Sequence, residues 1–211
     1  MRLKQDFQAT QVVRILVLLM FLIYGLGLTP LFQFNREAIV HYHAYWQLVT
    51  LHFAHHNLSH VIGDGIAFYL LGAMVYVRSK AQFYVLLGLN CLIEGPFFLY
   101  FMSVDGLAGS SGMCYSFLAW ILLDALTLSA SYRAWGWFTG ALAVGAFFII
   151  WNIKLYHGML SIAGGKGAYV PAHILSALIG VVVFCVYRVW QRGTRGEACI
   201  PFFVGFKRIK T

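Results

Sequence analysis

Apolar residues are gathered into six segments, each close to the roughly 20 residues that an α-helix needs to cross a bilayer. The segments cover Val12–Phe32, Leu58–Val77, Ala81–Met102, Ser111–Ser129, Ala134–Ile153 and Tyr169–Trp190. Short polar stretches separate them, and neither a domain-sized hydrophilic stretch nor an internal repeat interrupts the pattern. We therefore predict an all-α membrane protein with six transmembrane helices. Residues 1–211 would form one domain, with cytoplasmic tails at 1–11 and 191–211.

The composition supports a bilayer rather than water as the surroundings of this chain. Hydrophobic residues make up 61% and charged residues 10%, whereas soluble domains have about 45–50% and about 25%. This excludes a soluble enzyme, a disordered chain and a collagen-like fibre. The first segment is too long for the apolar region of a signal peptide and lacks a small-residue cleavage site, so we interpret it as a retained anchor. The four cysteines have no metal-like spacing and are expected to be buried, inert thiols.

Basic residues are divided unevenly between alternate loops, and this division predicts the orientation. With the N-terminus inside, the cytoplasmic set is Arg2, Lys4, Arg14, Arg78, Lys80, Arg133, Arg188, Arg192, Arg195, Lys207, Arg208 and Lys210. The other side has only Arg36, Lys154 and Lys166. Both termini are therefore predicted to be cytoplasmic. Because the net charge of +8 comes from segment ends rather than a folded basic face, we expect anionic lipid and not nucleic acid as its partner.

A cluster of histidines enters the second segment, where ionisable groups are costly and usually functional. His56, His60 and Asp64 follow one another at four-residue intervals and so share one helical face. Imidazoles and a carboxylate in this arrangement suit a metal site. They also suit a hydrogen-bonding column that stabilises an oxyanion. A third interpretation is a polar loop whose histidines satisfy backbone groups.

Two further motifs suggest an activated serine. Gly109-Ser110-Ser111-Gly112 opens the fourth segment and is either a turn with an N-cap or a nucleophilic serine at a helix N-terminus. In the sixth segment, His173 lies within a stripe of small residues that allows close helix packing, namely Ala172, Ser176, Ala177 and Gly180. An intramembrane histidine should face a partner inside the bundle, and Ser111 is the candidate. A serine bonded to an imidazole is the minimal activated nucleophile.

With these three motifs in this order, the chain resembles the rhomboid family of intramembrane serine proteases. The family pattern is His, then Asn four residues later, on span two, Gly-x-Ser-Gly opening span four, and Ala-His on span six. The resemblance implies that Ser111 is the nucleophile and His173 its general base. It implies an oxyanion hole made by His60, the residue at position 64 and the Ser111 backbone N–H. Gly109 and Gly112 would let the substrate approach, and neither metal nor cofactor is expected.

The stretches Phe34–Ile39 and Trp46–His60 are most similar to the bacterial rhombosortase branch of that family. This resemblance implies an inner-membrane protease whose active site opens to the periplasm. Its substrates would be secreted or membrane-anchored precursors with a hydrophobic C-terminal or transmembrane segment. Within the branch, such substrates carry a C-terminal Gly-Gly tail followed by a hydrophobic segment and basic residues.

Two residues depart from the family pattern. Gln47 stands where many rhomboids have arginine, and Asp64 replaces the asparagine. We expect a buried Asp64 to act as a neutral acid that donates a hydrogen bond. In the alternative, Asp64 is ionised and pairs with His60 or His56. Glu94 and Asp124 have no catalytic role that the sequence reveals, and we expect both to form hydrogen bonds between spans.

Two other classes of function remain open from the sequence. One is a catalytically silent, rhomboid-like protein that binds transmembrane clients, as the Asp64 substitution would allow. Against it, both Ser111 and His173 are retained. The other class is a membrane metalloenzyme built on the span-two cluster with one more ligand, for which the candidate residues are His55, His56, His60 and Asp64 with His157 or His173.

Overall fold

The computed structural model describes residues 10–103, 105–127, 132–163 and 169–194. The elements are α2 (Gln11–Gly25), α3 (Thr29–Phe32), α4 (Arg36–Tyr42), α5 (Gln47–Thr50), η1 (Leu51–Phe53), α6 (Leu58–Arg78), α7 (Lys80–Phe101), α8 (Ser111–Thr127), α9 (Tyr132–Ala163) and α10 (Tyr169–Thr194). Over these residues the chain is helical and has no strand beyond an isolated bridge between Phe34 and Leu107. Most of both predicted tails, together with Cys199, lies outside the described residues.

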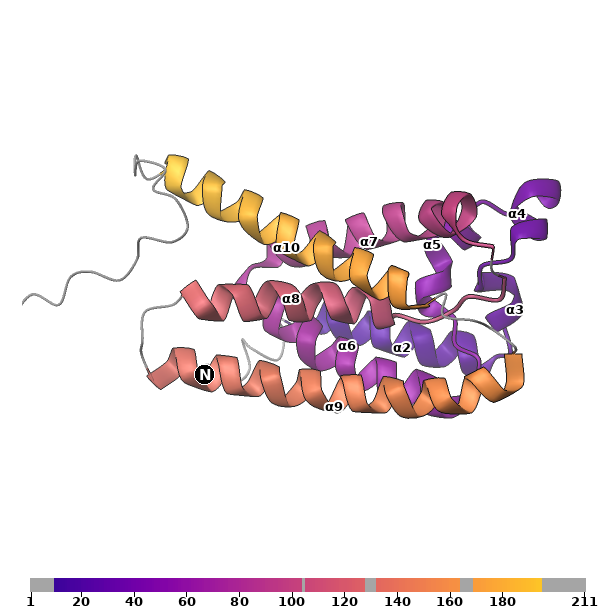
Figure 1. Ribbon diagram of the computed structural model, residues 1–211, viewed down its shortest axis with the longest axis horizontal. Helices are drawn as coiled ribbons and strands as arrows, with labels where there is room; N and C mark the ends of the chain where they lie inside the picture. Colours follow the sequence, from indigo (N-terminus) through magenta and orange to yellow (C-terminus); the bar gives the residue numbers. More distant parts are fainter. Residues whose placement is uncertain (1–9, 104, 128–131, 164–168, 195–211) are drawn as a thin grey trace, which may run out of the picture.

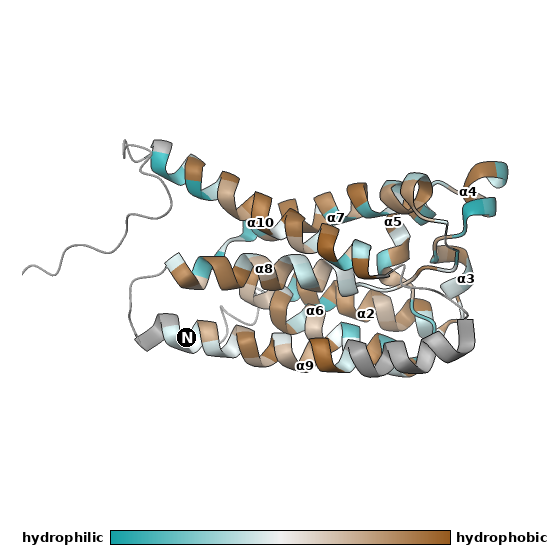
Figure 2. Cartoon of the chain, in the orientation of Figure 1, coloured by the Kyte–Doolittle hydropathy of each residue, from teal (hydrophilic) through white to brown (hydrophobic). Residues whose placement is uncertain are grey.

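Each predicted apolar segment contains a helix, so the all-helical prediction is confirmed. Three helical stretches are long and apolar enough to cross a membrane, namely Leu58–Arg78, Lys80–Phe101 and Val170–Arg192. Three further apolar helices have 10–17 residues, namely Gln11–Gly25, Ser111–Thr127 and Trp135–Trp151. Many large hydrophobic residues of the long helices are exposed. Hydrophobic residues are spread along these helices (Figure 2), which fits a protein that lies in a membrane.

The first and fifth predicted segments differ from the helices in the structure, each for an identifiable reason. The first segment is divided because Gly27 adopts a φ of +69°, a left-handed conformation that ends α2, and Pro30 then begins the short helix α3. The fifth segment continues as helix α9 to Ala163, beyond the predicted Ile153. The sequence has no proline between Tyr132 and Ala163, and two glycines, Gly164 and Gly165, come directly after Ala163.

The long helices run along one common direction and bring the starts of α6, α8 and α10 to the same end as α3, α4 and α5 (Figure 1). The end of α7 lies at that end too. Between the helices, aromatic rings pack together within a mixed aliphatic and aromatic core: Phe68 and Phe83 each pack on Phe117 with ring centroids 5.5 Å apart. Trp120 packs on Phe184 across α8 and α10. The end that gathers the helix starts also gathers the polar motifs of the sequence.

Close packing of α10 on α8 confirms the predicted small-residue stripe. Ala172 and Ser176 are buried. A Cβ atom added at Gly180 would overlap the carbonyl group of Ser116 and lie 3.1 Å from the Cβ of Ala119. Only glycine therefore allows the two backbones to approach this closely.

The intramembrane carboxyl groups form the inter-helix contacts that the sequence suggested. Arg78 Nε donates to Asp124 Oδ2 over 2.6 Å, which joins the end of α6 to α8 far from Ser111. Glu94 Oε1 lies 2.5 Å from Ser176 Oγ and joins α7 to α10. Among the described cysteines, Cys91, Cys114 and Cys185 are free thiols. Cys185 is exposed on α10, which corrects the expectation that it is buried.

We predict that Gly180→Ala destabilises the protein by about 1–3 kcal/mol, because the added methyl group overpacks the α8–α10 contact. Gly140→Ala on α9 is the matched control, since a Cβ there meets no atom within 4 Å. The control should be neutral or stabilise by up to about 1 kcal/mol through helix propensity. Unfolding curves in detergent measure both variants, and equal curves would contradict the packing.

Candidate active site

The loop that precedes Ser111 is held by backbone hydrogen bonds to two other segments. Phe34 N–H donates to Leu107 O over 2.8 Å, and Gly106 N–H donates to Phe34 O over 2.9 Å. Further along, Gly109 N–H donates to Leu51 O over 3.0 Å. A loop anchored at three points places the start of α8 with little freedom.

The start of α6 lies directly beneath this loop. Asn57 caps the helix, with its side-chain oxygen accepting a hydrogen bond from His60 N–H over 2.8 Å. Gly109 has a φ of +133°, and a Cβ at that position would lie 2.7 Å from His60 Nε2 and 3.1 Å from Asp64 Oδ2. The position requires glycine for both reasons: its backbone conformation and its contact with the histidine.

Ser111 and His173, which are 62 residues apart in sequence, meet at the starts of α8 and α10. Ser111 Oγ lies 2.9 Å from His173 Nε2, within the range of a nucleophile–base hydrogen bond. The ring of Tyr115 packs on the imidazole of His173 with a centroid distance of 4.5 Å and an interplanar angle of 34°. This packing fixes the orientation of the imidazole. Ser111 and His173, which together form the serine–histidine dyad, are both half-buried.

A small cavity of about 20 Å³, room for about one water molecule, adjoins the dyad. Its lining residues are Leu51, Glu94, Phe98, Leu107, Ala108, Gly109, Ser111, Gly112, Ala172 and His173. Gly109 and Gly112 line it, as the expected role in substrate approach requires. The N–H groups of the first turn of α8 have no partner within the helix and carry its positive dipole. An anion beside Ser111 would meet these groups.

His60 and Asp64 lie next to the loop and are not among the residues that line this cavity. Asp64 Oδ2 lies 3.4 Å from both His55 Nε2 and His60 Nε2, and 3.5 Å from Ser110 Oγ. Asp64 therefore faces two imidazoles and a hydroxyl rather than Ser111 itself. Of the two interpretations of Asp64, this arrangement favours a carboxylate that accepts hydrogen bonds. The part of both residues in an oxyanion hole stays a prediction.

His56 does not join Asp64, although the spacing suggested it. Its Nε2 lies 2.6 Å from Gly106 O, so it is a further contact of the loop before Ser111. Burial lowers the pKa of both His55 and His56 below the ordinary value for histidine, and it lowers the pKa of His52 to about 4. These three imidazoles, which precede α6, are therefore expected to be neutral at neutral pH.

Three residues have the donor set for a metal ion. Ligand atoms of His55, His60 and Asp64 lie within 4.8 Å of one another, and all three residues are buried. Their 3.4 Å separations are close to the roughly 3.3 Å between ligands of a tetrahedral zinc ion. Of the fourth ligands considered, His173 is bonded to Ser111. The side chain of His157 lies outside the described residues.

Sequence reasoning missed the place of two polar residues at the site. Glu94 lines the cavity beside the dyad, and the only sequence signal was a carboxyl group in an apolar segment next to Gly95-Pro96. Arg36 binds the end of α7 by donating to the carbonyl groups of Phe98, Leu99 and Met102.

Gln47, which stands where many rhomboids have arginine, is buried. Its side chain accepts a hydrogen bond from Asn35 N–H and donates one to Leu31 O. It therefore holds the segment before α4.

We predict that Gly109→Ala is destabilising, because alanine at this φ carries about 1–3 kcal/mol of strain and would also displace His60. Gly106→Ala is the matched control in the same loop. Its φ of +66° lies in the left-handed helical region, and a Cβ there meets no atom within 4 Å. Thermal unfolding in detergent should show a clearly larger loss for Gly109→Ala. The reverse order would mean that Gly109 does not pack on His60.

Comparison of the chain with models of protein families and with curated proteins finds no match.

Proposed function

We propose that this chain is an intramembrane serine protease of the rhomboid type, with Ser111 as nucleophile and His173 as general base. The observation that carries the proposal is the 2.9 Å contact between Ser111 Oγ and His173 Nε2 at the starts of two packed apolar helices. A serine paired with an imidazole beside a glycine-lined cavity and a helix N-terminus is the arrangement that acyl transfer needs.

The proposed reaction follows from this contact. Ser111 Oγ attacks the scissile carbonyl carbon while His173 Nε2 takes the hydroxyl proton. His173 then gives that proton to the leaving amine nitrogen as the C–N bond breaks. In the second half, water attacks the acyl carbon and gives its proton to His173, which returns it to Ser111 Oγ as the ester C–O bond breaks. The first-turn N–H groups of α8 would stabilise the oxyanion.

In this proposal His60 and Asp64 assist at the oxyanion, as the resemblance to rhomboid proteases implies. His60 lies against Gly109, two residues before the nucleophile. Because Asp64 faces the imidazole of His60, it would act by holding that ring in place. Gly109 and Gly112 leave room for the backbone of a substrate.

The proposed membrane arrangement has six spans, formed by α2, α6, α7, α8, α9 and α10. The described basic residues Arg78, Lys80, Arg188 and Arg192 belong to the ends of helices opposite the dyad (Figure 1). With these residues in the cytoplasm, the dyad would open to the periplasmic side of a bacterial inner membrane. Cleavage is then expected near the outer edge of a hydrophobic segment.

The proposed substrates are membrane-anchored or secreted precursors with a hydrophobic C-terminal or transmembrane segment. The resemblance to rhombosortases narrows this to proteins with a C-terminal Gly-Gly sorting tail.

A metalloenzyme is the second candidate, favoured by the three convergent ligand atoms of His55, His60 and Asp64. It would use the site beneath the loop rather than the dyad. A silent client-binding protein is disfavoured, because it has no need of a serine–imidazole hydrogen bond.

We predict that Ser111→Ala or His173→Ala abolishes cleavage, and that the double variant loses no more than either single one, because the two side chains act as a unit. The assay is co-expression with proteins that carry Gly-Gly-type C-terminal tails, followed by purified protein in liposomes. Ser59→Ala and His41→Ala change exposed residues of the same types and should keep full activity.

Full cleavage by Ser111→Ala together with loss of activity on chelation would replace the protease proposal with the metalloenzyme. Binding of intact precursors by the parent protein, without cleavage under any condition, would favour the client-binding protein.

The orientation predicts which sites an impermeant thiol reagent reaches in intact cells after the outer membrane is permeabilised. In a parent without its native cysteines, Asp105→Cys in the loop before Ser111 should be labelled. Lys80→Cys at the start of α7 should be labelled only after the inner membrane is opened. Both positions are exposed, so burial does not explain a difference between them. The reversed labelling pattern would invert the proposed topology.

A further inference from the structure

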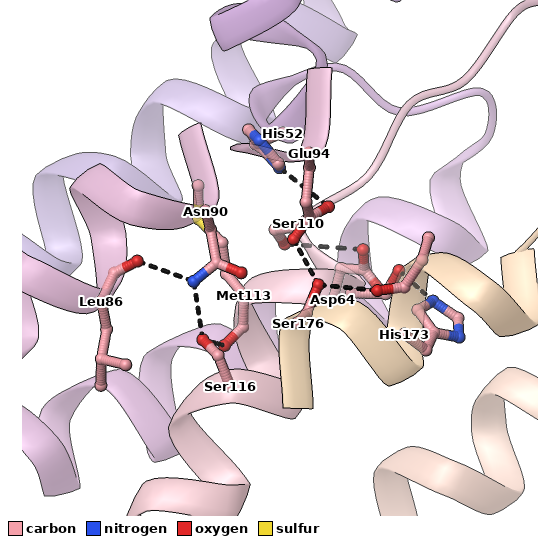
Figure 3. A network of polar contacts seen from close by, with 12 residues as sticks. His52, Asp64, Leu86, Asn90, Glu94, Ser110, Met113, Ser116, His173 and Ser176 are labelled. Atoms are coloured by element: carbon pink, nitrogen blue, oxygen red, sulfur yellow. Dashed lines mark hydrogen bonds and ion pairs between the residues drawn. The ribbon is translucent and has the colours of Figure 1, made fainter. Parts of the chain in front are cut away.

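Glu94 is a buried carboxyl group that touches both helices of the dyad. It lies on α7, is 3% exposed and lines the cavity together with Ser111 and His173. A Cβ atom at Gly112, the residue after Ser111, would come within 3 Å of all three atoms of the Glu94 carboxyl group. Figure 3 shows this group between His52 and Ser176, close to His173.

The two hydrogen bonds at Ser176 favour a protonated Glu94 carboxyl group. Ser176 Oγ is 2.5 Å from Glu94 Oε1 and 2.9 Å from Ala172 O. A hydroxyl group has one proton, and with a carboxylate at Glu94 both of these oxygens would compete for it. Each contact has a proton of its own when Ser176 donates to Ala172 O and a protonated Glu94 donates to Ser176 Oγ.

Among the residues that the structure describes, no cation near Glu94 would compensate a carboxylate. His52 Nδ1 lies 3.8 Å from Glu94 Oε2, too far for a hydrogen bond. Burial lowers the pKa of His52 to about 4, so this imidazole is neutral at neutral pH. The other described titratable groups around Glu94 are His173 across the cavity and the thiols of Cys91 and Cys114. His173 acts as a base only when its imidazole is neutral, and the two thiols carry no positive charge. A buried carboxylate without a compensating cation is costly in free energy.

The position of Ser176 links this acid to the base. Ser176 lies three residues after His173 on α10, on the turn that follows it. The Glu94 carboxyl group thus binds the first turns of α10 on one side and packs against the start of α8 on the other. Together these contacts hold His173 at its distance from Ser111.

We propose that Glu94 is a positioning residue that works only as a neutral acid, holding α10 against α8 so that His173 reaches Ser111. Ionisation of Glu94 in alkaline solution would remove one of the two hydrogen bonds at Ser176. It would also put a negative charge beside the N-terminus of α8, where the oxyanion has to form. The inference rests on the proposed protease function and adds that kcat/KM declines in alkaline solution.

The test compares the pH dependence of kcat/KM for the parent, Glu94→Gln and Glu94→Ala in liposomes. The amide of Glu94→Gln still donates to Ser176 and has no proton to lose. We expect kcat/KM within about threefold of the parent at neutral pH and no alkaline decline. Glu94→Ala should lose about tenfold or more at every pH, the scale of one lost hydrogen-bonded contact.

Asp124→Asn is the matched control, because it removes another buried carboxyl group of the bundle, one that pairs with Arg78 away from the dyad. It should leave the alkaline decline unchanged. The same decline in the parent and Glu94→Gln would overturn the proposal. A loss in Glu94→Gln as large as in Glu94→Ala would overturn it too, since the carboxylate would then be the working form.

An infrared difference spectrum between the parent and Glu94→Gln tests the proton without any activity. We expect the C=O stretch of a protonated carboxylic acid at neutral pH, lost in alkaline solution. Its absence at neutral pH would overturn the inference even if cleavage by Ser111 is established. If the band is present and no substrate is cleaved, the protease proposal fails instead and Glu94 is not a positioning residue for catalysis.

Discussion

The close approach of α10 to α8 is the constraint on which the rest of the site depends. Gly180 brings the α10 backbone onto the Ser116 carbonyl, and Ser176 and Ala172 continue the same narrow face toward the dyad. Any larger residue in this stripe would separate the helices. Ser111 Oγ and His173 Nε2 are 2.9 Å apart because backbone packing, several residues away, has already brought their helices together.

Polar groups inside this apolar bundle form inter-helix contacts, because lipid offers no alternative partner. Asp124 binds Arg78 at one end, and Asn90 joins α7 to α8 through Ser116 Oγ in the middle. Glu94 joins α7 to α10 beside the dyad. α7 therefore contacts both helices that carry the dyad and helps to hold them in place, although it contributes neither the serine nor the histidine.

The loop before Ser111 shows how backbone contacts prepare a reactive position. Hydrogen bonds with Phe34, Leu51 and His56 hold the loop in place, and Gly109 packs against the imidazole of His60. His56 and His60 of the histidine cluster thus contact this loop and support it. This explains why residues whose types suggest metal binding or catalysis lie around the cavity instead of in it.

The sequence alone determined the helices, because the length and composition of an apolar segment decide whether it forms a helix and joins an apolar bundle. It also indicated the Ser111–His173 pair and the small stripe of α10, since an intramembrane histidine needs a partner and small residues allow one to approach. Local spacing could not assign partners across helices. It grouped His56 and His60 with Asp64, whereas in the fold His60 and His55 face Asp64 and His56 contacts the loop. It also left Glu94 without a role. Only the tertiary structure decided these contacts, because the packing of α7 and η1 against α8 and α10 determines which polar atoms meet once water is excluded.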